Sequence, residues 1–178
     1  MNVSAKDLKA ESIDLCIVYA EDEDELRQSV TSILKRFFNN VHSVDNGQKA
    51  FEVVKKENVD IVLTDLNMPI MGGMELIQSI GKIEKNPKLI VMTAFNDTRT
   101  LEKLINLQVD HFTSKPLNKE QLITLLYKSA VSVNERKLLG QYEQDLDNEN
   151  NELRRKNDML TQKLNQLAAT NNQVVELE

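Results

Sequence analysis

The sequence has few of the residues that mark disulfide-rich or aromatic-rich proteins. It contains no tryptophan, a single cysteine at position 16, and only 4% aromatic residues among 178. One cysteine allows no internal disulfide bond, which fits a reducing compartment. Cys16 lies in an apolar run, and we interpret it as a small buried hydrophobic residue. Hydrophobic residues still make up 40% of the chain, so the sequence supports a core, which has to be aliphatic.

Long apolar segments and an excess of positive charge are also missing. No window approaches the length of a membrane span, and the first twelve residues, MNVSAKDLKAES, lack the apolar stretch of a signal peptide. We therefore expect a cytoplasmic protein that does not contact a membrane. The formal net charge is -6, and no run of lysine and arginine is longer than Arg154 to Lys156, so we expect no direct contact with nucleic acid.

Proline and glycine divide the chain near residue 117, because all three prolines and four of the five glycines lie before that point. In this part, five apolar runs predict strands, at 15–20, 41–44, 59–65, 88–94 and 109–114. Apolar residues at three- and four-residue spacing predict helices between them, at about 23–38, 47–57, 73–83 and 97–107. The alternation predicts an α/β fold, in which helices cover both faces of a doubly wound, five-stranded parallel sheet.

Charged and polar side chains stand at the carboxyl ends of the predicted strands, where parallel sheets place their sites. The first strand runs into Glu21 and Asp22, the third ends at Asp65, the fourth ends at Thr93, and the fifth leads to Lys115. Each alone could be a helix-terminal charge, a cap or a solvated side chain. Together they predict a site, because three neighbouring carboxylates repel one another unless a cation such as Mg²⁺ lies among them.

The chemistry of this set favours phosphate. A divalent ion, an ammonium group and a hydroxyl group suit an anion with several oxygens, and Asp65 could act as the nucleophile toward a phosphoryl group. The sequence contains no GxxxxGK[ST] loop, so it gives no support to nucleotide hydrolysis.

Four motifs, YAEDEDELR, LTDLNMPIMGG, VMTA and FTSKP, occur in this order within residues 13–130. Together they resemble the receiver domain of bacterial two-component response regulators, which has a CheY-like, flavodoxin-like fold. That family has an acidic pair after the first strand, an acceptor aspartate before an MPxMxG-like turn, a Thr or Ser, and a Lys-Pro pair. This sequence departs from the pattern in having Glu-Asp for the commoner Asp-Asp and Gly72 where aspartate is frequent. Neither departure removes a required group.

The resemblance implies that Asp65 accepts a phosphoryl group from a histidine kinase or phosphotransfer protein. It implies a Mg²⁺ site in which Asp22 and Asp65 bind directly, Glu21 binds through water and Asn67 offers its backbone carbonyl. Such a domain is a phosphoacceptor rather than an enzyme, with self-phosphorylation and slow self-dephosphorylation as its only catalysis.

The resemblance also assigns the phosphate contacts and the switch. The Thr93 hydroxyl and the Ala94 amide would bind the phosphate, and Lys115 would pair with a phosphate oxygen. The bond between Lys115 and Pro116 would be cis, as X-Pro bonds can be at modest cost. Phe112 stands where the family has its switch aromatic, which acts with Thr93. Plain core packing is the alternative interpretation of Phe112.

Beyond residue 118 the pattern stays helical and predicts a coiled coil over 131–176. A seven-residue repeat of apolar residues occupies the d positions, at Leu139, Leu146, Leu153, Leu160, Leu167 and Val174. The a positions are mostly polar, at Arg136, Glu143, Asn150, Asn157, Leu164 and Asn171. Asparagine at a weakens a coil but favours a parallel dimer, so we expect a parallel homodimer. Upstream, Leu122, Leu126, Ser129 and Val133 follow another register, so the register changes between 133 and 139. We expect an output domain to follow the coil.

Two other functions compete with this interpretation. A phosphatase of the haloacid dehalogenase type also uses a nucleophilic aspartate and Mg²⁺. It needs a second carboxylate two residues later, where this chain has Asn67, and its motif ends the first strand. The other alternative is a structural dimerisation module that is not phosphorylated. The presence of all five polar residues at the strand ends argues against it.

Overall fold

The computed structural model describes residues 3–94, 98–116 and 118–175, with backbone alone for 98–99 and 168–175. The strands are β1 (Cys16–Ala20), β2 (Asn40–Val44), β3 (Ile61–Asp65), β4 (Lys88–Thr93) and β5 (His111–Ser114). The helices are α1 (Ala5–Ser12), α2 (Asp24–Leu34), α3 (Gly47–Lys56), α4 (Gly73–Ile80), α5 (Thr98–Asn106) and α6 (Lys119–Val175). The chain divides into two units, Met1–Asn134 and Glu135–Glu178, which are described separately.

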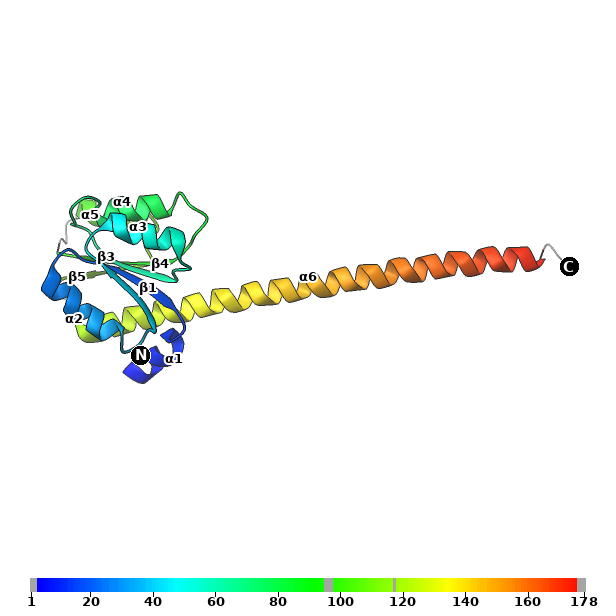
Figure 1. The fold of residues 1–178 in the computed structure, drawn as a ribbon, viewed down its shortest axis with the longest axis horizontal. Coiled ribbons are helices and arrows are strands. Elements are labelled where there is room, and N and C mark those ends of the chain that lie inside the picture. Colours follow the sequence, from blue (N-terminus) through cyan, green and yellow to red (C-terminus); the bar gives the residue numbers. More distant parts are fainter. Residues whose placement is uncertain (1–2, 95–97, 117, 176–178) are drawn as a thin grey trace. The chain divides into compact units, whose positions relative to one another are not determined.

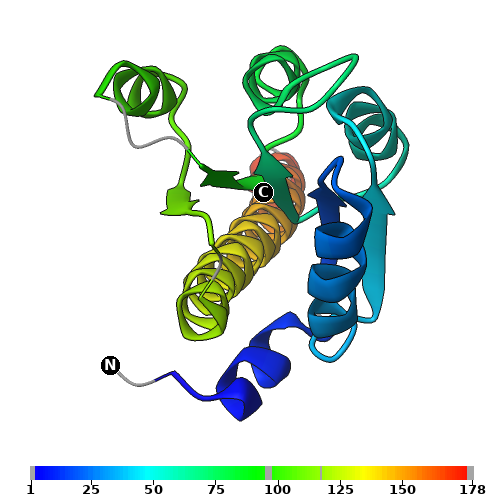
Figure 2. The ribbon, with the colours of Figure 1, turned by 90° about the vertical axis from the view of Figure 1, so that its left-hand side faces the viewer.

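All five strands are parallel and lie in the order β2-β1-β3-β4-β5, which confirms the predicted sheet (Figure 1). Helices α3, α4 and α5 cover one face, and α2 and the first turns of α6 cover the other (Figure 2). Every residue of β3 is buried, because this strand lies at the centre of the sheet and both of its faces are covered. This burial explains why the run at 59–65 shows no alternation of polar residues.

The core is aliphatic, as the composition requires. On the face covered by α2 and α6, side chains of the sheet such as Ile17 and Leu63 pack with Leu122, Leu126 and Val133 of α6. Burying one such side chain contributes about 1.5–3 kcal/mol. The upstream register of α6 is therefore the face that packs on the sheet, and α6 passes from it into the heptad region without a break.

Several predicted helices extend too far. The prediction of 23–38 is wrong after Leu34, where α2 ends, and the prediction of 73–83 is wrong after Ile80, where α4 ends. In both cases the chain continues as a turn, with backbone hydrogen bonds from the amide of residue i+3 to the carbonyl of residue i. One example is the bond from the Phe37 amide to the Leu34 carbonyl. Phe37 and Phe38 remain buried after the helix has ended, so the apolar pattern continues through a turn.

Helix α1 was missed by the sequence analysis, because eight residues with one buried leucine show no period. A capping box begins it, in which the Asp7 amide donates to Ser4 Oγ (3.2 Å) and the Ser4 amide donates to Asp7 Oδ2 (3.0 Å). Leu8 is fully buried in the core. Asn134 of α6 donates from Nδ2 to the Glu11 carbonyl (2.9 Å) and to Glu11 Oε2 (2.8 Å). Helix α1 is therefore an integral part of the first unit.

Ile70, in the loop after β3, adopts a left-handed conformation with φ of 70° and is 80% exposed. A β-branched residue is disfavoured there, and this one buries little apolar surface in return. Ile70→Gly should raise the free energy of unfolding by about 0.5–1 kcal/mol, because relief of the left-handed cost exceeds the entropy that glycine adds to the unfolded chain.

Urea denaturation followed by circular dichroism measures this change. Ile105→Gly is the matched control, because Ile105 is also largely exposed but lies in α5, where glycine should lower stability. A loss of stability in both variants would contradict the expected strain at Ile70.

Candidate functional site

The predicted site residues meet at one edge of the sheet. Glu21 and Asp22 directly follow β1, Asp65 and Thr93 are the last residues of β3 and β4, and Lys115 directly follows β5. The carboxylates of Glu21, Asp22 and Asp65 offer oxygens that all lie within 4.8 Å of one another. Thr93 is buried at the end of its strand, and its carbonyl accepts from the Lys115 amide (2.8 Å). The structure thus brings together the four charged side chains that the strand ends predicted, and it places Thr93 at the end of the strand that pairs with β3.

Lys115 links two of the three carboxylates. Its Nζ lies 2.8 and 3.0 Å from the two carboxylate oxygens of Glu21 and 2.9 Å from Asp65 Oδ2. Burial lowers the pKa of Lys115, but the hydrogen bonds and charges of Glu21 and Asp65 outweigh burial and hold it above its usual value. The side chain therefore stays protonated and supplies the positive charge of the site.

Glu21 is the most buried of the three acids, with 1% of its surface exposed. Burial raises the pKa of its carboxyl group, and the ammonium of Lys115 opposes that effect. Tyr19, fully buried on β1, donates its hydroxyl to Glu21 Oε2 at 3.4 Å. Burial and the neighbouring Glu21 raise the pKa of Tyr19, so this hydroxyl keeps its proton. Both oxygens of Glu21 therefore already have partners.

Asp65 is held by its own loop. The Leu66 amide donates to Asp65 Oδ1 (2.7 Å), which leaves Oδ2 toward Lys115. The loop folds back on the strand end, where the Gly73 amide donates to the Leu66 carbonyl (2.9 Å). A Cβ on Gly73 would lie 2.2 Å from the Asp65 carbonyl oxygen. Only glycine permits this close approach, which explains one of the two glycines in the motif.

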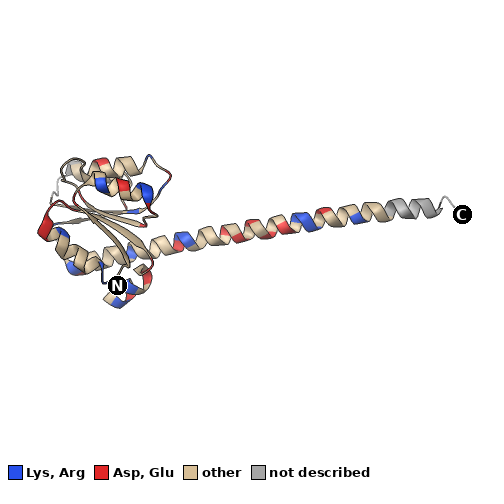
Figure 3. Cartoon of the chain, viewed as in Figure 1, with Lys and Arg blue, Asp and Glu red and all other residues tan. Residues whose placement is uncertain are grey.

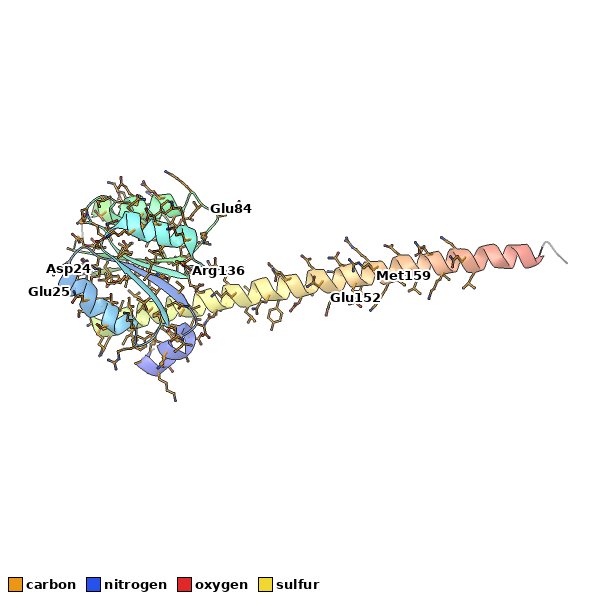
Figure 4. The ribbon with its side chains drawn as sticks, viewed as in Figure 1. Asp24, Glu25, Glu84, Arg136, Glu152 and Met159 are labelled. Carbon is orange, nitrogen blue, oxygen red and sulfur yellow. The ribbon has the colours of Figure 1, made fainter. Side chains whose placement is uncertain are left out.

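Arg27 of α2 is a site component that the sequence analysis missed. Its Nη1 donates to the backbone carbonyls of Glu21 (2.8 Å) and Asp22 (3.1 Å), and its guanidinium also pairs with Asp24. Asp24 and Glu25 mark the start of α2 at the carboxyl end of the strands (Figure 4). Arg27 thus fixes the backbone that carries the acidic pair. No sequence signal separated it from an ordinary helix arginine.

The remaining predicted residues lie close to this cluster in the chain. Ala94 follows Thr93 and is exposed, and Asn67 lies exposed in the loop after β3. The peptide bond between Lys115 and Pro116 is cis, which confirms that prediction. Phe112 is 47% exposed on β5, so its ring is not simply packed in the core. Its role as a switch stays a prediction.

The donor set at the sheet edge fits Mg²⁺. Glu21, Asp22 and Asp65 supply only oxygen ligands. Asp22 is exposed, whereas Glu21 and Asp65 are buried. Three carboxylates against one ammonium leave a formal charge of about −2 at short range, which a divalent ion would balance. Hard cations prefer this kind of oxygen site.

The second unit consists of the later turns of α6. Leucines at seven-residue spacing are 57–67% exposed in the single chain, at Leu139, Leu146, Leu153, Leu160 and Leu167. The side chains of Asn171 and Val174, which the heptad pattern includes, lie outside the described residues. Among the helices of the described ranges, none is both long enough and apolar enough to cross a bilayer.

Comparison with known sequences identifies the first unit. Residues 17–127 match the model of the response regulator receiver domain, which covers more than half of the chain. A cyclic di-GMP phosphodiesterase from Thermotoga maritima is 36% identical over 110 residues, 61% of this chain and 29% of that protein. The cell cycle response regulator CtrA from Brucella ovis is 24% identical over 111 residues, 62% of this chain and 48% of that protein. The chain therefore spans less than half the length of these relatives.

Solved structures lead to the same family. A LuxR-family DNA-binding response regulator from Staphylococcus aureus has a TM-score of 0.62 and 29% identity, over 66% of this chain and 99% of that one. The signal receiver domain of a putative LuxO repressor from Vibrio parahaemolyticus has a TM-score of 0.67 over 71% and 98%, and its 20% identity shows the fold alone. The chain therefore belongs to the response regulator receiver family, and it contains the receiver domain of a two-component response regulator.

Proposed function

We propose that this receiver accepts a phosphoryl group on Asp65 from the phosphohistidine of a histidine kinase or phosphotransfer protein. One observation carries the proposal: Asp65 stands beside two other carboxylates, with its Oδ2 held 2.9 Å from the Lys115 ammonium. A nucleophilic carboxylate next to a metal-binding pair and a fixed cation suits phosphoryl transfer.

Mg²⁺ would be held by Asp22 and Asp65, by the backbone carbonyl of Asn67, and by Glu21 through water. When bound, it neutralises the negative charge that otherwise keeps the anionic carboxylate and the phosphoryl group apart. Arg27 keeps the acidic pair in position through the backbone carbonyls of Glu21 and Asp22.

In the transfer step, a carboxylate oxygen of Asp65 attacks phosphorus and the bond between phosphorus and the histidine nitrogen breaks. The electron pair of that bond stays on the imidazole, and Asp65 becomes an acyl phosphate. Lys115 then pairs with a phosphate oxygen, while its contacts with both oxygens of Glu21 keep the ammonium in place. Thr93 donates its hydroxyl to the phosphate and the Ala94 amide donates beside it.

Phe112 would change position when Thr93 moves toward the phosphate. Its half-exposed ring on β5 has room for this change. The only catalysis we assign to the domain is self-phosphorylation and slow self-dephosphorylation. The phosphatase alternative is less well supported, because Asn67 cannot act as the second carboxylate and Asp65 ends β3, not β1. The presence of the whole charged cluster argues against a purely structural module.

The second unit would pair with a second copy of the chain as a parallel coiled coil. We assign the receiver to 13–130 and the coil to 131–176. A parallel, in-register pair places leucine against leucine at d and asparagine against asparagine at a, whereas an antiparallel pair would place asparagine opposite leucine. The exposed leucines of α6 support such a pairing. We further infer a cytoplasmic protein in which the coil leads to an output domain, since the curated relatives are more than twice as long as the matched region.

Asp65→Asn should abolish the lasting mass gain that acetyl phosphate and Mg²⁺ produce in the unsubstituted chain, because the amide lacks the nucleophilic oxygen anion. Intact mass spectrometry measures the gain, and Asp14→Asn is the control because Asp14 is exposed outside the site. Turnover of acetyl phosphate without a lasting adduct would support the phosphatase. Neither turnover nor adduct would support the structural module.

Asp22→Ala should weaken Mg²⁺ binding by at least about tenfold, because it removes a direct carboxylate ligand. The stability of the metal-free protein should hold or rise, because the substitution also removes repulsion between carboxylates. Titration calorimetry and urea denaturation measure the two effects. Unchanged affinity for Mg²⁺ would remove Asp22 from the proposed site.

Replacing Asn150 and Asn157 with valine should stabilise the dimer by roughly 1–3 kcal/mol per site, because each change buries apolar surface in place of an amide. Truncation after residue 133 should leave a folded receiver that is mostly monomeric. Sedimentation equilibrium at tens of micromolar tests both. A monomeric full chain, or a truncated chain that dimerises equally well, would show that the coil is not the dimerisation element.

A further inference from the structure

A groove on the first unit is lined by basic side chains from two helices, α1 and α6, and from the segment after α2. It has a volume of about 550 Å³ and is open to solvent, with Lys6 and Lys9 on α1, Lys35 and Arg36 after α2, and Lys119 at the start of α6. Its other lining residues are Ala5, Ile33 and Phe37, so the lining contains five cations and no acid. Figure 3 shows the basic colour on these elements. This concentration occurs in a chain of net charge -6.

These cations differ from four others of the receiver. Arg27, Lys49, Lys88 and Lys115 each form an ion pair with a carboxylate. Within the described residues, the five groove cations form no ion pair and no side-chain hydrogen bond. Asp7, which follows Lys6 in the sequence, is bonded to Ser4. Five like charges around one groove repel one another, and an anion in the groove would relieve that repulsion.

The wall formed by α1 is fixed in place. Leu8 is buried in the core, the Ser12 hydroxyl donates to the Phe37 carbonyl (3.2 Å), and Asn134 donates to Glu11. Lys6 and Lys9 are three residues apart and therefore lie on one side of this helix. Both precede the segment that matches the receiver family, residues 17–127. The groove is therefore built by adding α1 to the receiver.

We propose that this groove binds a small molecule that carries several phosphate groups. Its volume lies within the roughly 300–1,000 Å³ of small-molecule sites. Lysine binds phosphate as a point charge, and four of the five cations are lysines. Ile33, which is partly buried, provides an apolar contact for the rest of the ligand. A ligand here contacts α1, α2 and α6 together and stabilises their packing.

Two macromolecular anions fit the groove less well. A flat anionic membrane does not complement a concave site with cations around it. Single-stranded nucleic acid needs exposed aromatic rings for stacking, and the one aromatic residue of the lining, Phe37, is buried.

Inorganic tripolyphosphate is the probe, titrated calorimetrically without Mg²⁺ so that the proposed phosphoacceptor chemistry is not involved. We expect one site per chain and a rise in melting temperature. Lys6→Gln/Lys9→Gln and, separately, Lys35→Gln/Arg36→Gln should each weaken binding at least about tenfold. The second pair leaves α1 unchanged, so loss in both variants cannot result from undocking of α1.

Lys82→Gln/Lys103→Gln is the matched control, because both lysines are exposed outside the groove and the net charge changes equally. This control should bind within about twofold of the unsubstituted chain. Asp65→Asn should bind tripolyphosphate normally, which separates this site from the proposed acceptor. Equal weakening in control and groove variants, or no binding to the unsubstituted chain, overturns the proposal.

Anionic phospholipid vesicles and a DNA duplex, tested at the same salt concentration, distinguish the sources of phosphate. Binding of vesicles or duplex that depends on the groove lysines, without binding of tripolyphosphate, would assign the groove to a membrane or to nucleic acid and overturn the small-molecule proposal. Binding of tripolyphosphate that outcompetes both supports it.

Discussion

The charge balance at the carboxyl edge of the sheet is the constraint on which the rest of the site depends. Three carboxylates with oxygens within 4.8 Å of one another cannot stay ionised together without positive charge. Lys115 supplies one charge and contacts two of the acids at 2.8–3.0 Å. The negative charge that Lys115 does not balance remains near Asp22. This acid is exposed, so solvent and a metal ion can reach it.

Rigid backbone makes this balance specific. Arg27 holds the carbonyls of Glu21 and Asp22, and the close approach of Gly73 to the Asp65 carbonyl fixes the loop after β3. Strand β3, which ends at Asp65, is buried on both faces, so the position of its end cannot adjust without disturbing the core. The charged groups therefore meet because they stand at neighbouring strand ends of one sheet. The free energy that holds them together comes largely from burial of aliphatic side chains in the core.

The sequence predicted the sheet and the five polar strand ends because both signals are local. Buried strands show as unbroken apolar runs, and Asp65 is followed at once by turn residues. Helix α1 and Arg27 were not predicted, since one buried leucine gives no period and a guanidinium that bonds backbone carbonyls looks like any helix arginine. The basic groove was equally hidden, because its cations come from separate elements that only tertiary packing assembles.

Helix α6 joins two kinds of packing in one continuous element. Up to Val133 its apolar residues are buried against the sheet, and from Leu139 its leucines are exposed at seven-residue spacing. A helix transmits a rotation or shift along its axis only if its backbone bonds continue, and no residue between 133 and 139 interrupts them. Because Asn134, which bonds Glu11 of α1, is the last residue of the first unit, α1 restrains α6 just where its register changes.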